Sequence, residues 1–269
     1  MEVGLSTASF FGKYDLEDIP ARIHAIGADV CEVFLNTFSE YQPSFIELLR
    51  ARILEEGLRV FGVHPMSVQF ESQLFSIYTR QRTDAEELFE QVLRAGARLG
   101  ATCYVMHGPA GMYGAAKNVQ LERIGPMLQK LCERAGEHGI TIAWENVSWC
   151  LFSRPEVGKE LLAATGADDL RFTLDVKQAA RSGYAPEDYV RAMGGRLMNV
   201  HLCDYLLREG GGIYPRLPGK GVCDYTALRA ALQEVNYKGP AFLEVYSDLY
   251  EEEEALQESF AYVRHCLKT

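Results

Sequence analysis

Short apolar stretches recur along the chain. Each is followed by a longer segment in which apolar residues return every three or four positions. Alternation of these two patterns predicts strands and helices that take turns, as in a parallel sheet. The predicted strands cover residues 2–10, 29–36, 58–65, 101–111, 139–146, 169–175, 196–204 and 239–246. The predicted helices cover residues 15–26, 45–56, 81–99, 121–139, 155–165, 186–193, 225–235 and 251–267.

The number of strand–helix units favours a closed barrel over an open sheet. Eight units in 269 residues match the size of a (β/α)8 barrel, which typically needs about 250 residues. The first predicted strand runs into TASFFGKYD, which lacks the glycine fingerprint of an open dinucleotide-binding sheet. No linker-like stretch separates the units. We therefore predict an α/β fold, a (β/α)8 TIM barrel, with residues 1–269 as a single domain.

Composition narrows the class of partners. A net charge of −10 argues against wide contact with a nucleic-acid backbone. No apolar run reaches the roughly 18 residues that span a membrane, and the N-terminal sequence lacks the pattern of a signal peptide. The seven cysteines include no C-x-x-C pair and favour a reducing, cytoplasmic setting. We expect no nucleic-acid or membrane partner; the oligomeric state is left open, with a homo-oligomer as one option.

Four predicted strands end in a residue that can bind a metal: Glu145, Asp175, His201 and Glu244. In a parallel barrel the carboxyl ends of all strands meet at one face, so these side chains should converge. Three carboxylates and an imidazole cost several kcal/mol to bury unless a cation compensates them. We expect one divalent metal ion there. The oxygen-rich ligand set favours manganese, magnesium or cobalt, with zinc as an alternative.

Other polar residues near the same face have two interpretations. His64 and His107 end the third and fourth strands; each is either a site residue or a loop histidine bonded to backbone. Asp175 could also cap the helix that follows it. Asp204, in H-x-x-D spacing with His201, is either a helper of that histidine or a turn cap. The nearby cations either hold a substrate anion or are solvated: Lys177, Arg181, Arg208, Arg216 and Lys220.

The motifs IAWEN, FTLDVKQA, NVHLCD, LPGKGVCDY and FLEVY, in this order, resemble the xylose-isomerase-like superfamily of sugar and sugar phosphate isomerases and epimerases, which also contains endonuclease IV. The resemblance to its ketose 3-epimerase branch implies one manganese-like ion held by the four strand-end residues, with the two glutamates as the acid/base pair. Two departures stand out. Gln178, preceded by Lys177, stands where many members have a histidine. The loop 210–221 lacks the histidine of endonuclease IV.

This resemblance implies a metal-dependent isomerase or epimerase acting on a ketose or sugar phosphate through an enediolate. Glu145 and Glu244 would move the proton. The expected substrate contacts are His64, His107, Lys177, Gln178 and Arg216. Two alternatives remain open. One is a lyase or dehydratase acting on an inosose-like keto-sugar. The other is a metal-free barrel that binds a carbohydrate or a partner protein without turnover.

Overall fold

Eight parallel strands close into a barrel in the computed structural model, which describes residues 1–66, 70–111 and 115–268, with side chains from residue 120 onward in the last stretch. The strands pair in the order β1–β10–β7–β6–β5–β4–β3–β2, and β2 pairs back with β1. This confirms the predicted TIM barrel. The barrel strands are β1 (Val3–Ser6), β2 (Val30–Leu35), β3 (Arg59–Pro65), β4 (Cys103–Met106), β5 (Thr141–Glu145), β6 (Arg171–Asp175), β7 (Leu197–Leu202) and β10 (Ala241–Leu243).

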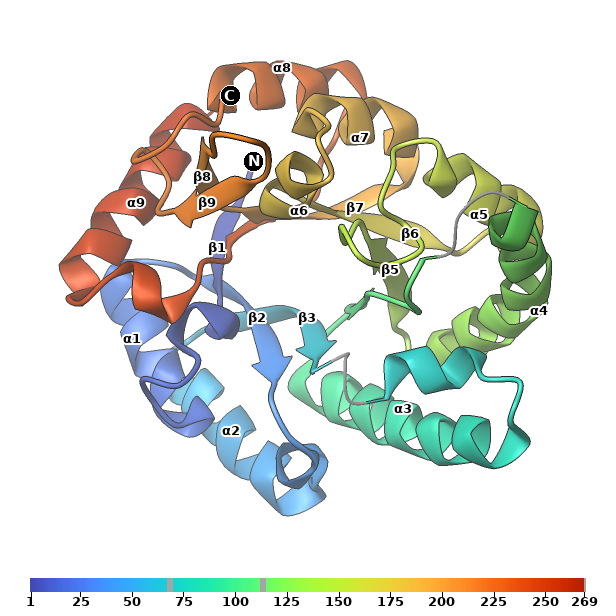
Figure 1. The fold of residues 1–269 in the computed structure, drawn as a ribbon. Coiled ribbons are helices and arrows are strands. Elements are labelled where there is room, and N and C mark those ends of the chain that lie inside the picture. The colour runs from blue at the N-terminus through green and yellow to red at the C-terminus, as the bar shows by residue number, and fades with distance from the viewer. Residues whose placement is uncertain (67–69, 112–114, 269) are drawn as a thin grey trace.

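Helices surround the barrel and cover its outer face (Figure 1). No helix in the described ranges is both long enough and apolar enough to cross a membrane. The helices are α1 (Ile19–Ile26), α2 (Pro43–Glu55), α3 (Thr79–Leu99), α4 (Ala115–Glu137), α5 (Val157–Thr165), α6 (Val176–Arg181), α7 (Pro186–Met193), α8 (Tyr225–Glu234) and α9 (Glu253–Cys266).

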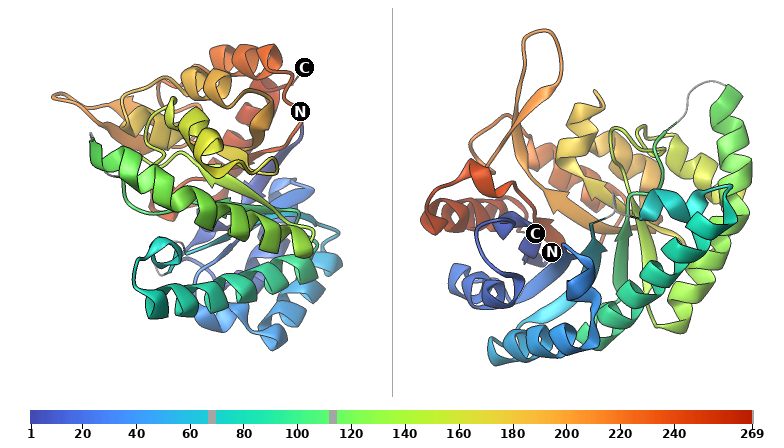
Figure 2. Two further views of the ribbon diagram at one scale, coloured as in Figure 1. Left: turned by 90° about the vertical axis from the view of Figure 1, so that its right-hand side faces the viewer. Right: turned by 60° about the horizontal axis from the view of Figure 1, so that its bottom comes forward.

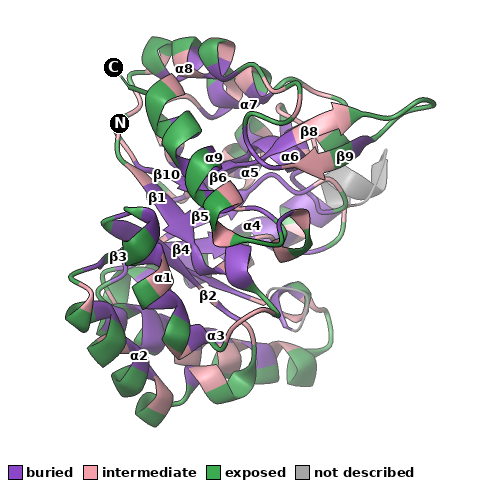
Figure 3. Ribbon diagram, turned by 90° about the vertical axis from the view of Figure 1, so that its left-hand side faces the viewer, coloured by how far each residue is buried: buried purple, intermediate pink, exposed green. Residues whose placement is uncertain are grey.

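The local sequence explains where these elements begin and end. Barrel strands bury both faces, and β4 is buried at all four positions, so these strands are continuous apolar runs rather than alternating ones. Helices bury only one face (Figure 3). Gly27, Gly100 and Gly166 adopt the left-handed conformation that ends α1, α3 and α5. These three helices end where the sequence predicts, at residues 26, 99 and 165.

The inside of the barrel is divided into two layers. Toward the amino ends of the strands lies a small apolar cluster of Cys103, Val105 and Ala143, separate from the main core. The rings of Phe61 and Phe242 lie 5.6 Å apart. Side chains alternate between the two faces of a strand, so the interior positions recur every two residues. The next interior position of β5 after Ala143 is Glu145, and the one after Phe242 is Glu244.

The chain departs from the predicted elements in several places. Helix α4 begins at Ala115, earlier than predicted, and the short helix α6 follows Asp175 directly. The glycine-rich segment predicted as a loop contains an antiparallel hairpin of β8 (Asp204–Leu207) and β9 (Ile213–Arg216). Glycine content suggested a loop, but three glycines with positive φ form only the hairpin tip at 210–212. The hairpin projects from the body of the barrel (Figure 2).

Asp204 fastens the base of this hairpin. Its buried carboxylate accepts backbone N–H groups from Tyr205 at 2.8 Å, Gly219 at 3.0 Å, Gly221 at 3.1 Å and Cys223 at 2.8 Å. A carboxylate with several N–H donors is well compensated in a buried position. Of the two roles considered for Asp204, the structure supports the turn cap.

Candidate metal centre

The four strand-end residues converge at the carboxyl ends of the strands. Glu145 and Asp175 are the last residues of β5 and β6, His201 is the fifth residue of β7, and Glu244 directly follows β10. One oxygen or nitrogen atom from each lies within 4.8 Å of the corresponding atoms of the other three. The expected convergence of these side chains is thus present in the structure.

His201 lies at the centre of this group, here called the quartet. Its Nδ1 atom lies 3.0 Å from Glu145 Oε1 and 3.2 Å from Glu244 Oε2. Its Nε2 atom lies 3.2 Å from Glu32 Oε2, on the far side of the ring. One ring nitrogen therefore faces the other quartet members and the other faces the barrel interior.

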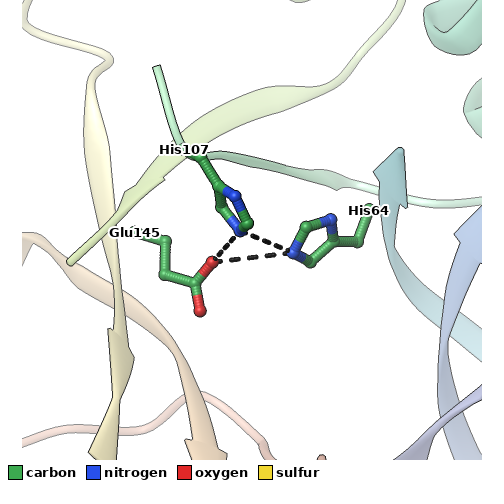
Figure 4. Close-up of side chains that lie close together, drawn as sticks. All are labelled: His64, His107 and Glu145. Atoms are coloured by element: carbon green, nitrogen blue, oxygen red, sulfur yellow. Dashed lines mark hydrogen bonds and ion pairs between the residues drawn. The ribbon is translucent and has the colours of Figure 1, made fainter. Parts of the chain in front are cut away.

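His64 and His107 lie against the outer side of Glu145 (Figure 4). His107 Nε2 lies 2.6 Å from Glu145 Oε2, and His64 Nε2 lies 3.5 Å from the same oxygen. The two Nε2 atoms are 3.1 Å apart. His64 Nδ1 also lies 2.9 Å from the Pro65 carbonyl, so this histidine combines the backbone contact and the site contact that the sequence offered as alternatives.

Lys177 is buried at the edge of the quartet. Its Nζ atom lies 3.2 Å from Asp175 Oδ2 and 3.8 Å from Glu244 Oε1, and 4.8 Å from the centre of the Tyr246 ring. The sequence suggested a substrate contact for this residue. The structure shows that its ammonium group also compensates two of the carboxylates.

Asp175 serves two purposes at once. Its Oδ1 atom accepts the backbone N–H of Gln178 at 2.6 Å and caps α6. Its backbone exchanges hydrogen bonds of 2.7 and 3.0 Å with the Asn146 side chain, which fixes the end of β6 against β5. Gln178 in turn accepts the Ser148 hydroxyl at 2.9 Å. Oδ1 is thus occupied by the cap, and Oδ2 faces Lys177.

A cavity of about 420 Å³ opens above the quartet. Arg216, although predicted as a substrate contact, is not in its wall: the guanidinium donates to the Pro215 carbonyl and lies beside Tyr214. The substrate role of Arg216 therefore stays a prediction. The cavity wall consists of Ala8, Phe11, Phe34, His64, Met66, His107, Glu145, Asp175, Lys177, Gln178, Glu244, Val245, Tyr246, Ser247 and Asp248.

Burial and neighbouring charge act in opposite directions on these groups. Burial alone would raise the pKa of Glu145, but the imidazoles of His107 and His201 outweigh it and hold that pKa well below the usual range. Burial raises the pKa of Asp175, which the Lys177 ammonium only partly offsets. Burial would lower the pKa of Lys177, but Asp175 and Glu244 raise it well above its usual value. The site therefore keeps Glu145 and Lys177 charged.

Two buried carboxylates near the site, those of Glu32 and Glu71, were not predicted from the sequence. Glu32 in β2 contacts His201, and Glu71 accepts hydrogen bonds from the Tyr104 hydroxyl at 3.0 Å and the His107 backbone N–H at 2.8 Å. Glu32 interrupts the apolar run VCEVF, just as Glu244 interrupts FLEVY. Glu71 follows no predicted strand, so no signal in the sequence pointed to it.

The residues fit a divalent cation. Three carboxylates and one imidazole are the donors that manganese, magnesium or cobalt accept in proteins. Glu244 Oε2 is buried, accepts no hydrogen bond from the described part of the chain and lies 3.2 Å from His201 Nδ1, another proposed ligand atom, so an ion between them could bind both. Lys177 and the histidines already compensate part of the negative charge, since the carboxylates raise the pKa of His64 to about 9 and the pKa of His201 well above its usual value. A divalent ion would add to that compensation.

The sequence model of the family described as "Xylose isomerase-like TIM barrel" matches residues 20–266. Among curated proteins, a 3-dehydroshikimate dehydratase of Pseudomonas aeruginosa is 24% identical over 263 residues. That match covers 92% of this chain and 38% of the relative, so the chain spans less than half the length of that protein.

Several solved structures share the fold. A D-psicose 3-epimerase of Clostridium cellulolyticum H10, solved with D-tagatose, superposes with a TM-score of 0.81 at 16% identity over 100% of both chains. The 3-keto-D-glucoside 4-epimerase YcjR of E. coli gives 0.78 at 18% identity, covering 99% of this chain and 100% of that chain. The IOLI protein with a bound zinc atom gives 0.80 at 15% identity, covering 99% and 98%. At these identities the likeness establishes the fold alone.

Proposed function

This chain belongs to the xylose isomerase-like TIM barrel family, and on that premise we propose that it is a divalent-metal-dependent isomerase or epimerase of a small keto-sugar. The observation that carries the proposal is the quartet itself. Two glutamates, an aspartate and a histidine meet at the floor of a cavity large enough for a monosaccharide. Ketose epimerases are among the proteins that share this fold.

Glu145 and Glu244 are the proposed acid/base pair. Both line the cavity and both contact His201 Nδ1, so a sugar bound above that nitrogen would lie within reach of the two carboxylates. One would remove the proton next to the carbonyl, and the other would return a proton to the resulting enediolate. A divalent ion in the quartet would polarise the carbonyl and stabilise its developing charge.

His64 and His107 are proposed to orient Glu145 and to meet the hydroxyl groups of the sugar. Both line the cavity, and both approach Glu145 Oε2. Gln178 is proposed as a further hydroxyl contact, since its side chain is held by Ser148 at the cavity wall. Hydrogen-bond donors fixed in advance lower the entropy that orienting a substrate requires.

The charge of the cavity favours a neutral sugar over a sugar phosphate. Its wall carries four carboxylates, of Glu145, Asp175, Glu244 and Asp248. The proposed ion, Lys177 and His64, whose pKa is raised to about 9, offset those of the quartet, and the described residues of the wall include no arginine and no second lysine that could meet a phosphate. The Lys177 ammonium already faces Asp175 and Glu244. A phosphate dianion would add negative charge to this wall. We therefore propose an unphosphorylated substrate whose far end meets the polar wall at 246–248.

The metal is proposed to be manganese, magnesium or cobalt, because three of the four donors are hard oxygen atoms. Zinc is the alternative, and a structure of the same fold holds a zinc atom. Elemental analysis of protein purified without added metal identifies the ion. A protein that neither contains nor binds a divalent ion would contradict the proposed function.

Proton exchange tests the chemistry directly. The protein is incubated in D2O with Mn²⁺ and with D-psicose, D-tagatose or D-fructose, and deuterium at the carbon beside the carbonyl is followed by NMR. Glu244→Gln is expected to slow incorporation by about 10²- to 10⁴-fold, the usual contribution of a general base. Glu258→Gln is the matched control, since Glu258 is exposed and lies 3.9 Å from Lys220. Incorporation at the wild-type rate in Glu244→Gln would refute the assignment.

A dehydratase is the second candidate, favoured by the relative from Pseudomonas aeruginosa. The same proton removal beside a carbonyl can be followed by loss of a hydroxyl group instead of reprotonation. With 3-dehydroshikimate as substrate, this route gives a conjugated product that absorbs in the ultraviolet, without reversible deuterium exchange. Appearance of that product, with no exchange into the ketoses, would replace the first proposal by the second.

A further inference from the structure

A buried carboxylate lies below the quartet, inside the barrel. Glu32 is in the middle of β2 and is fully buried. In the order of the barrel, β2 is separated from β7 by β1 and β10. The side chain of Glu32 therefore crosses the interior to reach His201. Gly62 helps to leave it room, since a Cβ there would come within 3.5 Å of Glu32 Oε2 and 3.3 Å of the Cys103 Cβ.

The contacts of Glu32 indicate which nitrogen atoms of Asn199 and His201 carry a proton. Asn199 Oδ1 accepts the Val200 backbone N–H at 2.9 Å, which points the Asn199 amide NH₂ toward Glu32 Oε2, 2.7 Å away. His201 Nε2 lies 3.2 Å from the same oxygen and 3.1 Å from Glu32 Oε1. A carboxylate only accepts hydrogen bonds, so His201 Nε2 must donate. Its Nδ1 atom lies 3.0 Å from Glu145 Oε1 and 3.2 Å from Glu244 Oε2, so without an ion it donates as well. A divalent ion bound among these carboxylates would replace the Nδ1 proton, while the Nε2–H keeps its hydrogen bond to Glu32.

The cost of burying Glu32 indicates that this contact has a role. A carboxylate in the barrel interior is unfavourable unless hydrogen bonds or a cation compensate it. Within the described ranges, the side-chain partners shown for Glu32 are Asn199 and His201. Neither contact is needed to fill the barrel, which apolar side chains occupy in the layer below.

We propose that Glu32 positions the metal ligand His201. It accepts a hydrogen bond from the Nε2–H of His201 and so presents Nδ1 as the ligand atom. The inference rests on the proposed function in that it requires the quartet to bind a divalent ion. It assigns the orienting role to Glu32, from across the barrel. Asp204, which follows His201 closely in sequence, is committed to four backbone N–H groups instead.

The test compares Mn²⁺ affinity, by calorimetry, in wild-type protein and three variants. Glu32→Gln loses the charge and presents an amide to Asn199, and it is expected to weaken Mn²⁺ binding by about 10- to 100-fold. Asn199→Ala, which frees one Glu32 oxygen, should weaken binding less. Asp204→Asn is the matched control, a buried carboxylate without contact to His201. It is expected to lower thermal stability and to leave Mn²⁺ affinity within about threefold of wild type.

A measurement on the wild-type protein covers the case in which Glu32→Gln does not fold. Selective ¹⁵N-histidine labelling of the Zn²⁺-loaded protein should show His201 protonated at Nε2 and bound to the ion through Nδ1. Binding through Nε2, or Mn²⁺ affinity in Glu32→Gln equal to that of wild type, would overturn the role of Glu32 and leave the proposed function intact. Failure of the wild-type protein to bind any divalent ion would overturn both.

Discussion

The two layers of the barrel interior lie two residues apart on the same strands and differ completely in chemistry. On β5, Ala143 belongs to the apolar lower cluster and Glu145 to the quartet. Between Phe242 and Glu244 the same change occurs. Two residues of strand span about 7 Å. Within that distance the interior changes from a packed apolar plug to a group of charges.

This contrast shows how the barrel separates stability from chemistry. The lower layer stabilises the folded state because it removes apolar surface from water. The upper layer costs free energy, and the structure reduces that cost with Lys177, with the hydrogen bonds of Asp175 and with the imidazoles around Glu145. Substitutions in the lower layer should therefore mainly lower stability, whereas substitutions of the carboxylates in the upper layer should mainly lower activity.

The largest expected effect on stability comes from the lower layer. Phe242→Ala should lower the free energy of unfolding by about 3–5 kcal/mol, because it leaves a cavity in the apolar plug. Glu244→Gln, two residues later, should lower it less, because the loss of the pairs with Lys177 and His201 is offset in part by relief of the repulsion between Glu244 and Glu145. Urea unfolding in the presence of EDTA measures both. Equal losses in the two variants would show that the layers are not energetically distinct.

The next effect is expected at Lys177. In EDTA, Lys177→Met should lower the free energy of unfolding by about 3 kcal/mol, because Asp175 and Glu244 lose their shared ammonium. Saturating Mn²⁺ should reduce this loss, since the ion supplies the missing positive charge. Lys177→Arg, which keeps the charge, is the control. A loss that is the same with and without Mn²⁺ would argue for packing rather than charge compensation.

A smaller effect on stability is expected at Gly4, because the absence of a side chain there leaves room for the Phe242 ring in the lower layer. A Cβ at Gly4 would come within 2.7 Å of Phe242 Cε1 and would also press on the Val30 carbonyl. Gly4→Ala should cost about 1–3 kcal/mol of stability through overpacking. Gly136→Ala in α4, where a Cβ meets nothing within 4 Å, is the control. If the loss arises at Phe242, adding Phe242→Leu should recover part of it; no recovery would place it elsewhere.

The smallest expected effect is on the pH dependence of stability. Burial raises the pKa of Glu71, which His107 only partly offsets, so the folded state favours the protonated carboxyl. The folded protein then holds a proton that the unfolded chain releases at about pH 4.3, and stability falls as pH rises from there through the raised pKa. Glu71→Gln should remove this part of the fall. Parallel stability–pH curves for wild type and Glu71→Gln would contradict it.

The barrel and the quartet could be predicted because their signals are local. A strand end is visible in the sequence, and parallel strands of a barrel present all such ends at one face. Glu145, Asp175, His201 and Glu244 could therefore be grouped without knowing a single long-range contact. The family resemblance gave the same four residues.

The remaining features depend on contacts between distant parts of the chain. Glu32 lies 169 positions from His201, and its strand position alone does not say which residue it meets across the barrel. Lys177 was recognised as a cation at the site, but its pairing with Asp175 and Glu244 depends on its rotamer and burial. The hairpin was missed because the glycines at 210–212, 219 and 221 suggested irregular structure, whereas the residues on either side of 210–212 pair.

The hydrogen bonds of Asp204 allow the hairpin to be altered separately from the barrel. Its carboxylate fixes Gly219, Gly221 and Cys223 beside the start of β8, so the two ends of the segment are held together independently of what lies between them. The tip at 210–212 extends away from the barrel (Figure 2). Residues there can be lengthened, shortened or exchanged without transmitting the change to His201. Grafting at this tip is therefore a route to new recognition properties on an unaltered barrel.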